Sequence, residues 1–272
     1  MELIATARFK KAMDRSVAAR DYTEQLAKIL KNIAAVGGEL SHPLLKNRPT
    51  QRTAVLVLTG NRGLCGGYNS NAVKQAMGLL GQWSGDKMKT HVTVSGKRGI
   101  NALKFRGITI DEEHLKFEDK PAFSEVAPIG ESYLKSYIEG GIDRLDVVYT
   151  RVVNIAKQEA VAETLLPLQP PTDEETFESP AGHLASEEYD FYPSAESILE
   201  EILPASFQSR LFKCFLDSAV SEQVARMVAM KGATENASGI IKDLSRRYNR
   251  ARQTQITGEI MEILGGVEAL KK

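Results

Sequence analysis

Two short segments of the sequence carry residue types that could act chemically. Residues 60–69 (GNRGLCGGYN) are rich in glycine, and glycines between a strand and a helix let phosphate oxygens approach backbone N–H groups. Cys65, in the same segment, is a potential nucleophile if a base lies near it. Residues 111–114 (DEEH) offer carboxylates and an imidazole of the kind that bind metals. Phosphate binding, covalent catalysis and metal binding are therefore the chemistries to consider.

Each segment has a structural interpretation that fits better. Residues 60–69 contain neither G-x-G-x-x-G nor the G-K-[ST] ending of a P-loop, so tight turning and close packing explain these glycines. No histidine lies near Cys65 in sequence, and free cysteine is usually a small buried residue. Residues 111–114 lack a second cluster with metal-ligand spacing, which favours a solvated strand end. We therefore predict no catalytic residue, no cofactor and no metal.

Composition narrows the class of protein. The chain has 272 residues, of which 42% are hydrophobic, enough for a sizeable core and roughly two structural units. Lys plus Arg and Asp plus Glu are both 35, and this balance argues against a nucleic-acid-wrapping protein. Two cysteines make neither a disulfide framework nor a four-ligand zinc site. No apolar run reaches the ~18 residues of a membrane span. These observations predict a soluble protein of a reducing compartment.

The ends of the chain have helical periodicity. Residues 205–264 lack proline, and an apolar seam recurs there at a period near the 3.5 of a coiled coil. Such a helix would be ~90 Å long, ending at Gly265-Gly266. The N-terminal seam covers only ~54 Å, so part of the C-terminal helix should lack a mate from its own chain. The seams are Ala5, Phe9, Ala12, Ser16, Ala19, Thr23, Leu26, Leu30 and Ile33, and Val220, Val224, Met227, Met230, Thr234, Ala237, Ile241, Leu244, Tyr248 and Ala251.

The middle of the chain changes to α/β periodicity. Apolar runs at residues 53–59, 90–94, 108–110, 145–153 and 161–168 predict strands, and helical stretches separate most of them. This alternation predicts an α/β fold with a small, mostly parallel, Rossmann-like sheet. The predicted domains are an N-terminal coiled-coil helix (1–37), the α/β domain (38–204) and a C-terminal coiled-coil helix (205–272).

Two charged segments have open interpretations. Residues 170–186 are acidic and proline-containing, which favours a solvated surface loop over a docking segment. Residues 242–252 form a basic stretch of the C-terminal helix, for which a partner-facing patch and a solvated face are equally consistent. That stretch contains Lys242, Arg246, Arg247, Arg250 and Arg252.

Several blocks, in order along the chain, resemble one family: the gamma subunit of the F-type ATP synthase. Residues 1–8 (MELIATAR) look like the family's M-E-[ML]-[VI]-A-x-x-[KR] start, and residues 62–69 match its R-G-L-C-G-x-x-N turn. Residues 192–194 (YPS) precede a helix, and residues 225–237 resemble the A-R-M-x-A-M…A-T-x-N-A block. Residues 248–253 (YNRARQ) and 256–266 are similar to the C-terminal signature. Three residues depart from the family pattern. Asn61 stands where the family usually has Asp, and Gly258 and Val267 also differ from the usual residues.

The resemblance implies a rotor shaft without an active site of its own. It implies an antiparallel coiled coil inside a ring of alpha and beta subunits, and an α/β domain that touches the epsilon subunit and the membrane c-ring. Proton or sodium flow would turn this shaft, on the cytoplasmic face of a bacterial inner membrane. By motif match, the partner-contact residues are Met1, Arg226, Gln253, Thr257, Glu259 and Glu262. Two alternatives are a nucleotide-binding α/β enzyme with a coiled-coil dimerisation arm and a structural coiled-coil adaptor.

Overall fold

The computed structural model describes residues 2–36, 42–85, 88–117, 120–154, 157–169 and 195–270. The chain divides into two compact units, Met1–Met227 and Val228–Lys272. This division differs from the predicted boundaries at 37 and 204, because the first half of the long C-terminal helix packs with the α/β core. The acidic segment 170–186 lies outside the described residues, so its interpretation as a surface loop stays a prediction.

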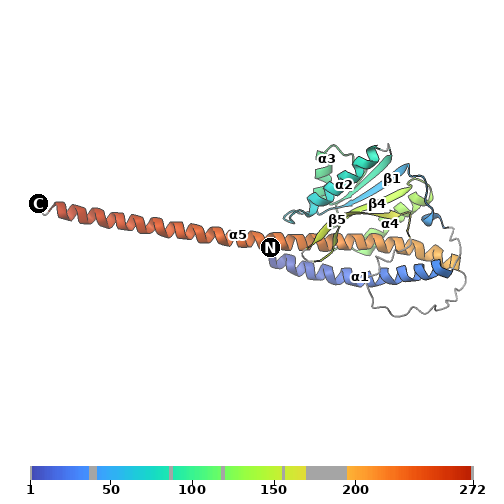
Figure 1. Ribbon diagram of the computed structural model, residues 1–272, viewed down its shortest axis with the longest axis horizontal. Coiled ribbons are helices and arrows are strands. Elements are labelled where there is room, and N and C mark those ends of the chain that lie inside the picture. Colours follow the sequence, from blue (N-terminus) through green and yellow to red (C-terminus); the bar gives the residue numbers. More distant parts are fainter. Residues whose placement is uncertain are drawn as a thin grey trace. The chain divides into compact units, whose positions relative to one another are not determined.

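A five-stranded sheet forms the centre of the first unit (Figure 1). Its strand order is β3-β2-β1-β4-β5. β5 runs antiparallel to β4, and all other neighbours are parallel, which confirms the predicted, mostly parallel sheet. The strands are β1 (Arg52–Leu58), β2 (Lys89–Ser95), β3 (Glu112–His114), β4 (Arg144–Val152) and β5 (Gln158–Leu166). The helices are α1 (Glu2–Val36), α2 (Tyr68–Gly85), α3 (Lys97–Phe105), α4 (Phe123–Ile138) and α5 (Ala195–Ala269), with a 3-10 turn η1 at Pro43–Leu45.

The sheet is covered by helices on both faces. β1 is buried along nearly its whole length, as expected for a central parallel strand. Its residues alternate between two hydrophobic clusters: Leu56 belongs to the cluster of α4 and α5, and Val57 to the cluster of α2 and α3. The first unit is therefore three-layered, and the first part of α5 is one of the elements that complete its core.

The strand predicted at residues 108–110 is wrong. Gly107, with φ +77°, follows α3, and the Ile108 N–H donates to the Leu103 carbonyl (3.1 Å). The backbone there closes the helix and does not join the sheet, although Ile108 and Ile110 pack against the α2–α3 cluster. The first backbone hydrogen bond to β2 is donated by the Asp111 N–H to the Val92 carbonyl (2.9 Å), and the paired strand begins at Glu112. Residues 108–110 are apolar because their isoleucine side chains pack against the core, and not because the segment forms a strand.

Helix α1 packs antiparallel to the first part of α5 (Figure 1). Ser16 Oγ donates to Asp217 Oδ1 (3.2 Å), and the Thr23 and Ser209 hydroxyls lie 2.7 Å apart. The α5 partner moves backward along the chain as the α1 residue moves forward, which defines an antiparallel pair. Every predicted seam position of α1 whose side chain is described is buried or half-buried. The predicted pairing of the two terminal helices is therefore confirmed.

Helix α5 is longer than predicted at both ends. It begins at Ala195 instead of 205, with Pro204 inside it, because Leu199 and Leu203 are buried in the core and stabilise the extra turns. It continues past Gly265-Gly266 to Ala269. A glycine costs a helix only about 1 kcal/mol relative to alanine, which weakens a helix without ending it.

The second unit, Val228–Lys272, is helical as far as Ala269. Every side chain from residue 233 to residue 270 is exposed, including the apolar side chains of Ile241, Leu244 and Tyr248. Nothing in the described part of the chain covers them, as the length of the C-terminal seam predicted. Long helices in proteins owe most of their stability to packing, so this unit is incomplete as it stands.

The small residues of the α1 seam generate a stability prediction. Ala12 is buried against Val220 and Val224, so Ala12→Leu should overpack the seam and lower the free energy of unfolding by about 1–3 kcal/mol. Ala18→Leu, at an exposed position of the same helix, should change it by less than about 0.5 kcal/mol. Urea unfolding followed by circular dichroism measures both. Equal effects would contradict the seam.

Candidate functional site

The glycine-rich turn, residues 60–69, follows the carboxyl end of β1. In the sheet, β2 lies on one side of β1, and β4, which comes later in the chain, lies on the other side of β1. In open α/β sheets, ligands bind at the carboxyl ends of the strands where the strand order reverses. This turn is therefore where a ligand of an α/β enzyme would be sought.

In this protein, helix α5 fills that position. The hydroxyls of Tyr68 and Ser218 lie 2.6 Å apart, and Ser221 Oγ donates to the carbonyl of Thr150 in β4 (2.7 Å). The carboxylate of Glu222 lies against Gly60, where a Cβ would approach Glu222 Oε1 to 2.7 Å. The residues of α5 from Ser218 to Arg226 thus hold the strand ends, and we call them the α5 clamp.

An ion pair within one helix completes the α5 clamp. Arg226 pairs with Glu222 one turn earlier, and their side chains are only 12% and 10% exposed. Arg226 Nη2 also approaches the carbonyl of Gly63 (3.5 Å). Because both charges are largely removed from water, each is stabilised mainly by the opposite charge of its partner. Arg226 therefore braces the turn against α5.

The backbone groups of the turn are occupied by protein atoms. The Gly60 N–H donates to Asn69 Oδ1 (2.8 Å), and the Lys97 N–H donates to Asn61 Oδ1 (2.9 Å). The Glu222 carboxylate beside Gly60 would repel a phosphate. The interpretation of these glycines as packing residues is supported, and the phosphate-binding alternative is not.

Asn61 uses its amide in a way that aspartate could not. Its Nδ2 donates to the carbonyls of Leu115 and Phe117, at 2.9 and 3.0 Å. A carboxylate has no proton to donate to either carbonyl. Asn61 thus ties the turn to the segment that follows β3, which gives its departure from the family pattern a physical role.

Cys65 has the surroundings of a structural thiol. It is buried, and burial first, then the nearby Glu222 carboxylate, raises the pKa of its thiol. The Asn69 amide donates to its Sγ (3.1 Å). A raised pKa leaves little thiolate at neutral pH, and the thiolate is the reactive form. The alternative of a nucleophilic cysteine therefore loses support.

The acidic segment at residues 111–114 does not assemble a metal centre. Glu113 pairs with Lys104, and Asp111 accepts the Val92 N–H (2.7 Å). Burial lowers the pKa of His114, although Glu112 acts in the opposite direction. Across the described residues, no three His, Cys, Asp or Glu side chains are grouped so that they could hold a metal ion.

Comparisons with known proteins identify the family of this chain. The family described as ATP synthase matches residues 1–270. An ATP synthase gamma chain of Rhodopirellula baltica is 58% identical over 272 residues, covering 100% of this chain and 92% of the relative. The chain belongs to the ATP synthase gamma chain family. Another gamma chain, of Frankia casuarinae, is 40% identical over 275 residues, covering 99% of this chain and 91% of its own.

Solved structures of this gamma-family protein's distant relatives share its fold. The central stalk and c-ring structure of the Tetrahymena thermophila mitochondrial ATP synthase contains a chain with TM-score 0.61 and 16% identity, covering 86% of this chain and 97% of that one. A Euglena gracilis mitochondrial ATP synthase chain has TM-score 0.58 and 17% identity, covering 97% and 95%. These confirm an α/β domain combined with long paired helices.

Family membership decides the class of function. A gamma chain is the central-stalk subunit of a rotary ATP synthase, couples rotation to ATP synthesis and has no catalytic site of its own. It belongs to a membrane-associated complex. Within the described residues, no helix combines the length and apolar character needed to cross a membrane.

The expected contact residues of the gamma family fall into two groups. Arg226 lies in the first unit, within the α5 clamp. The others that the structure describes lie in the second unit and are exposed, with Gln255 Nε2 donating to Glu259 Oε1 (3.0 Å). The second group is Gln253, Thr257, Glu259 and Glu262. The sixth expected contact residue, Met1, lies outside the described residues. Glu222 was missed from sequence, although its i,i+4 spacing to Arg226 was a usable signal.

The α5 clamp generates a prediction about Arg226. Arg226→Glu would place two carboxylates together where water is scarce, so it should lower the free energy of unfolding by about 3–5 kcal/mol. Arg246→Glu makes the same change on the same helix, at a side chain that is 73% exposed, and should cost less than about 1 kcal/mol. Urea titrations of the two variants give the comparison. A mild Arg226 variant would mean that the pair braces nothing.

Proposed function

We propose that the second unit, Val228–Lys272, is the part of the shaft that alpha and beta subunits enclose. One observation carries this proposal: the unit's helix exposes a row of apolar side chains that no described residue covers. Ile241, Leu244 and Tyr248 are 64%, 58% and 66% exposed. An extended apolar surface of this kind marks a protein interface. The names of the relatives, ATP synthase gamma chains, supply the identity of the enclosing subunits.

The exposed polar residues of the second unit are proposed to make contacts with the enclosing beta subunits. Gln253, Thr257, Glu259 and Glu262 can donate or accept hydrogen bonds on a helix whose backbone groups are already paired. As the shaft turns, their contacts with each beta subunit change in turn. A rotor that contacts one conformation more favourably than another shifts the population toward it. Three sites are thereby held in different states at any moment.

The first unit is proposed to receive the torque. Its fold resembles that of a chain in a solved structure of a central stalk and c-ring. The surface of its α/β domain is proposed to contact the epsilon subunit and the c-ring. The α5 clamp then transmits rotation, because Ser218, Glu222 and Arg226 connect the strand ends to α5 by directed hydrogen bonds and an ion pair. Directed contacts resist twisting better than an apolar contact that can slide.

The remaining details of the setting are also proposals. We place the complex on the cytoplasmic face of a bacterial inner membrane, since the two relatives named above are bacterial chains. The coupling ion is a proton or sodium. The alternative of a nucleotide-binding enzyme with a dimerisation arm has no support from the turn at residues 60–69, which α5 fills.

A charge reversal in the second unit tests the proposed contacts. Glu262→Lys should leave the helix intact, because lysine and glutamate have similar helix propensities. It should reduce the ions pumped per ATP hydrolysed, since removing a charged hydrogen bond from a buried interface costs about 2–5 kcal/mol. The measurement compares ATP hydrolysis with ion pumping in vesicles that contain the assembled complex.

The matched control for this test is Glu235→Lys, the same change at another exposed position of the helix. It lies outside the expected contact set, so its pumping per ATP should stay close to that of the unmodified complex. If Glu262→Lys also pumps normally, the proposed contact positions are ordinary solvated residues.

A further inference from the structure

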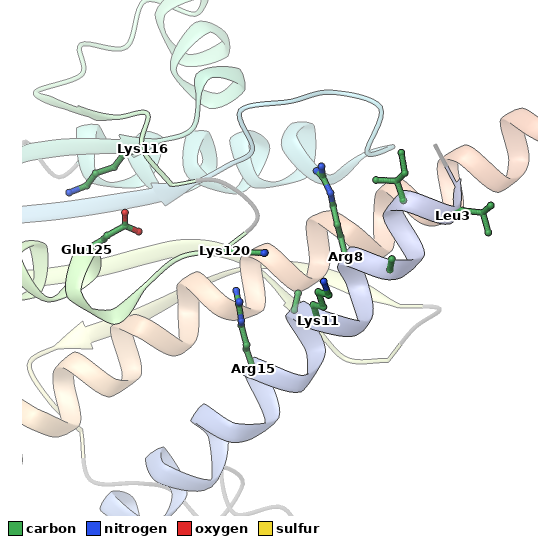
Figure 2. Close-up of a pocket in the computed structure, with 10 residues that line it drawn as sticks. Leu3, Arg8, Lys11, Arg15, Lys116, Lys120 and Glu125 are labelled. Carbon is green, nitrogen blue, oxygen red and sulfur yellow. The ribbon is translucent and has the colours of Figure 1, made fainter.

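Glu163, on the edge strand β5, connects the sheet to the part of α5 that precedes the α5 clamp. Figure 1 and Figure 2, a close-up of the groove beside the start of α1, both show α5 running between α1 and the strands of the first unit. On the strand side, Arg210 Nη2 of α5 donates to Glu163 Oε1 (3.1 Å). The two side chains are 17% and 31% exposed. None of the functions discussed above uses this pair.

The carboxylate of Glu163 is itself held by β4. The Tyr149 hydroxyl donates to Glu163 Oε2 (2.6 Å). Tyr149 is paired with Val161 across the two strands, so its ring reaches Glu163 diagonally. Burial first, then Cys214 and Glu163, raises the pKa of the Tyr149 hydroxyl, which therefore keeps its proton for this bond. Each carboxylate oxygen has a donor of its own, and we call Tyr149, Glu163 and Arg210 the Glu163 triad.

Stability alone does not explain a charge at position 163. Val161, two residues earlier on the same face of β5, packs against the cluster of α4 and α5, and an apolar residue at 163 could do the same. A partly buried ion pair is often no more stabilising than well-packed apolar side chains of similar volume. The ion pair differs in being directional, because hydrogen bonds weaken steeply away from their preferred geometry.

The location of Arg210 gives this directional contact a mechanical use. At 1.5 Å per residue, Arg210 lies about 18 Å along the helix from Glu222 of the α5 clamp. A helix attached at one place can pivot there, whereas a second attachment also fixes the direction of its axis. The Glu163 triad joins α5 to β4 and β5, while the α5 clamp joins it to the turn after β1 and to the end of β4.

We propose that Glu163 is a positioning residue for torque transmission. Acting through Arg210, it provides the second of two attachments that keep α5 fixed in direction when the first unit turns. Glu163 holds its own position through Tyr149, so a twist of α5 is opposed by both strands. This inference rests on the proposed role of the first unit in receiving the torque.

Replacing the whole triad by apolar residues tests this role. The variant carries Tyr149→Phe, Glu163→Leu and Arg210→Met, and its free energy of unfolding should stay unchanged or rise. In the assembled complex the alpha and beta subunits are fixed to glass, and a bead is attached through a cysteine in place of Lys74, exposed on α2. Because the two attachments are far enough apart to act independently, losing one should roughly double the variance of the bead's angle while the complex waits for ATP.

A matched control replaces another ion pair between a helix and a strand. Lys104 of α3 pairs with Glu113 of β3, away from α5, so Lys104→Met with Glu113→Leu should leave the variance unchanged. Arg210→Lys keeps the charge but loses the planar fork of donors. Its variance should lie between those of the unmodified complex and the triad variant, and it decides the question if the triad variant does not fold.

Two outcomes would overturn the inference. One is a variance equal to that of the unmodified complex in Arg210→Lys and in any folded triad variant, which would make Glu163 a structural residue only. The other is an equal increase in the Lys104 and Glu113 control. Both leave the proposed function intact, provided that the unmodified complex assembles and turns its bead when ATP is added. An unmodified complex that fails to turn the bead would contradict the proposed function itself.

Discussion

The second unit of this protein is a helix that no other described part of the chain covers. Residues 228–269 amount to roughly 60 Å of helix at 1.5 Å per residue, and every side chain from 233 to 270 is exposed. A solvent-exposed helix with apolar side chains is marginal in water. The chain must therefore be completed by other subunits, and this requirement explains why so much of its sequence makes no contact within the described structure.

The first unit shows how an α/β fold can serve as a mount for a helix. The position at the carboxyl end of β1 that would hold a ligand in an enzyme holds residues of α5 instead. Gly60 lacks a side chain where the Glu222 carboxylate approaches, and the Glu222–Arg226 pair joins the turn to the helix. The same residues account for the absence of an identified phosphate site at the turn and for the fixed attachment of α5.

Periodicity predicted the elements of this protein well, and contacts distant in sequence less well. The α1 seam, the buried strand β1 and the uncovered part of α5 follow from repeat spacing and helix length alone. Residues 108–110 resembled a strand because burial, and not sheet pairing, sets an apolar pattern. The extension of α5 through Pro204 depends on burial of Leu199 and Leu203 in a core assembled from distant segments. The i,i+4 spacing of Glu222 to Arg226 can be read from the sequence, but the contact of Glu222 with Gly60 forms only when β1 and α5 meet.

Hydrogen–deuterium exchange of the backbone amides tests the central claim most directly. Amides of residues 233–270 belong to a helix without tertiary support, so in the isolated chain they should exchange much faster than those of β1. After assembly with alpha and beta subunits, the same amides should become protected, while those of β1 change little. Slow exchange of residues 233–270 in the isolated chain, or no added protection in the complex, would contradict a shaft that other subunits must enclose.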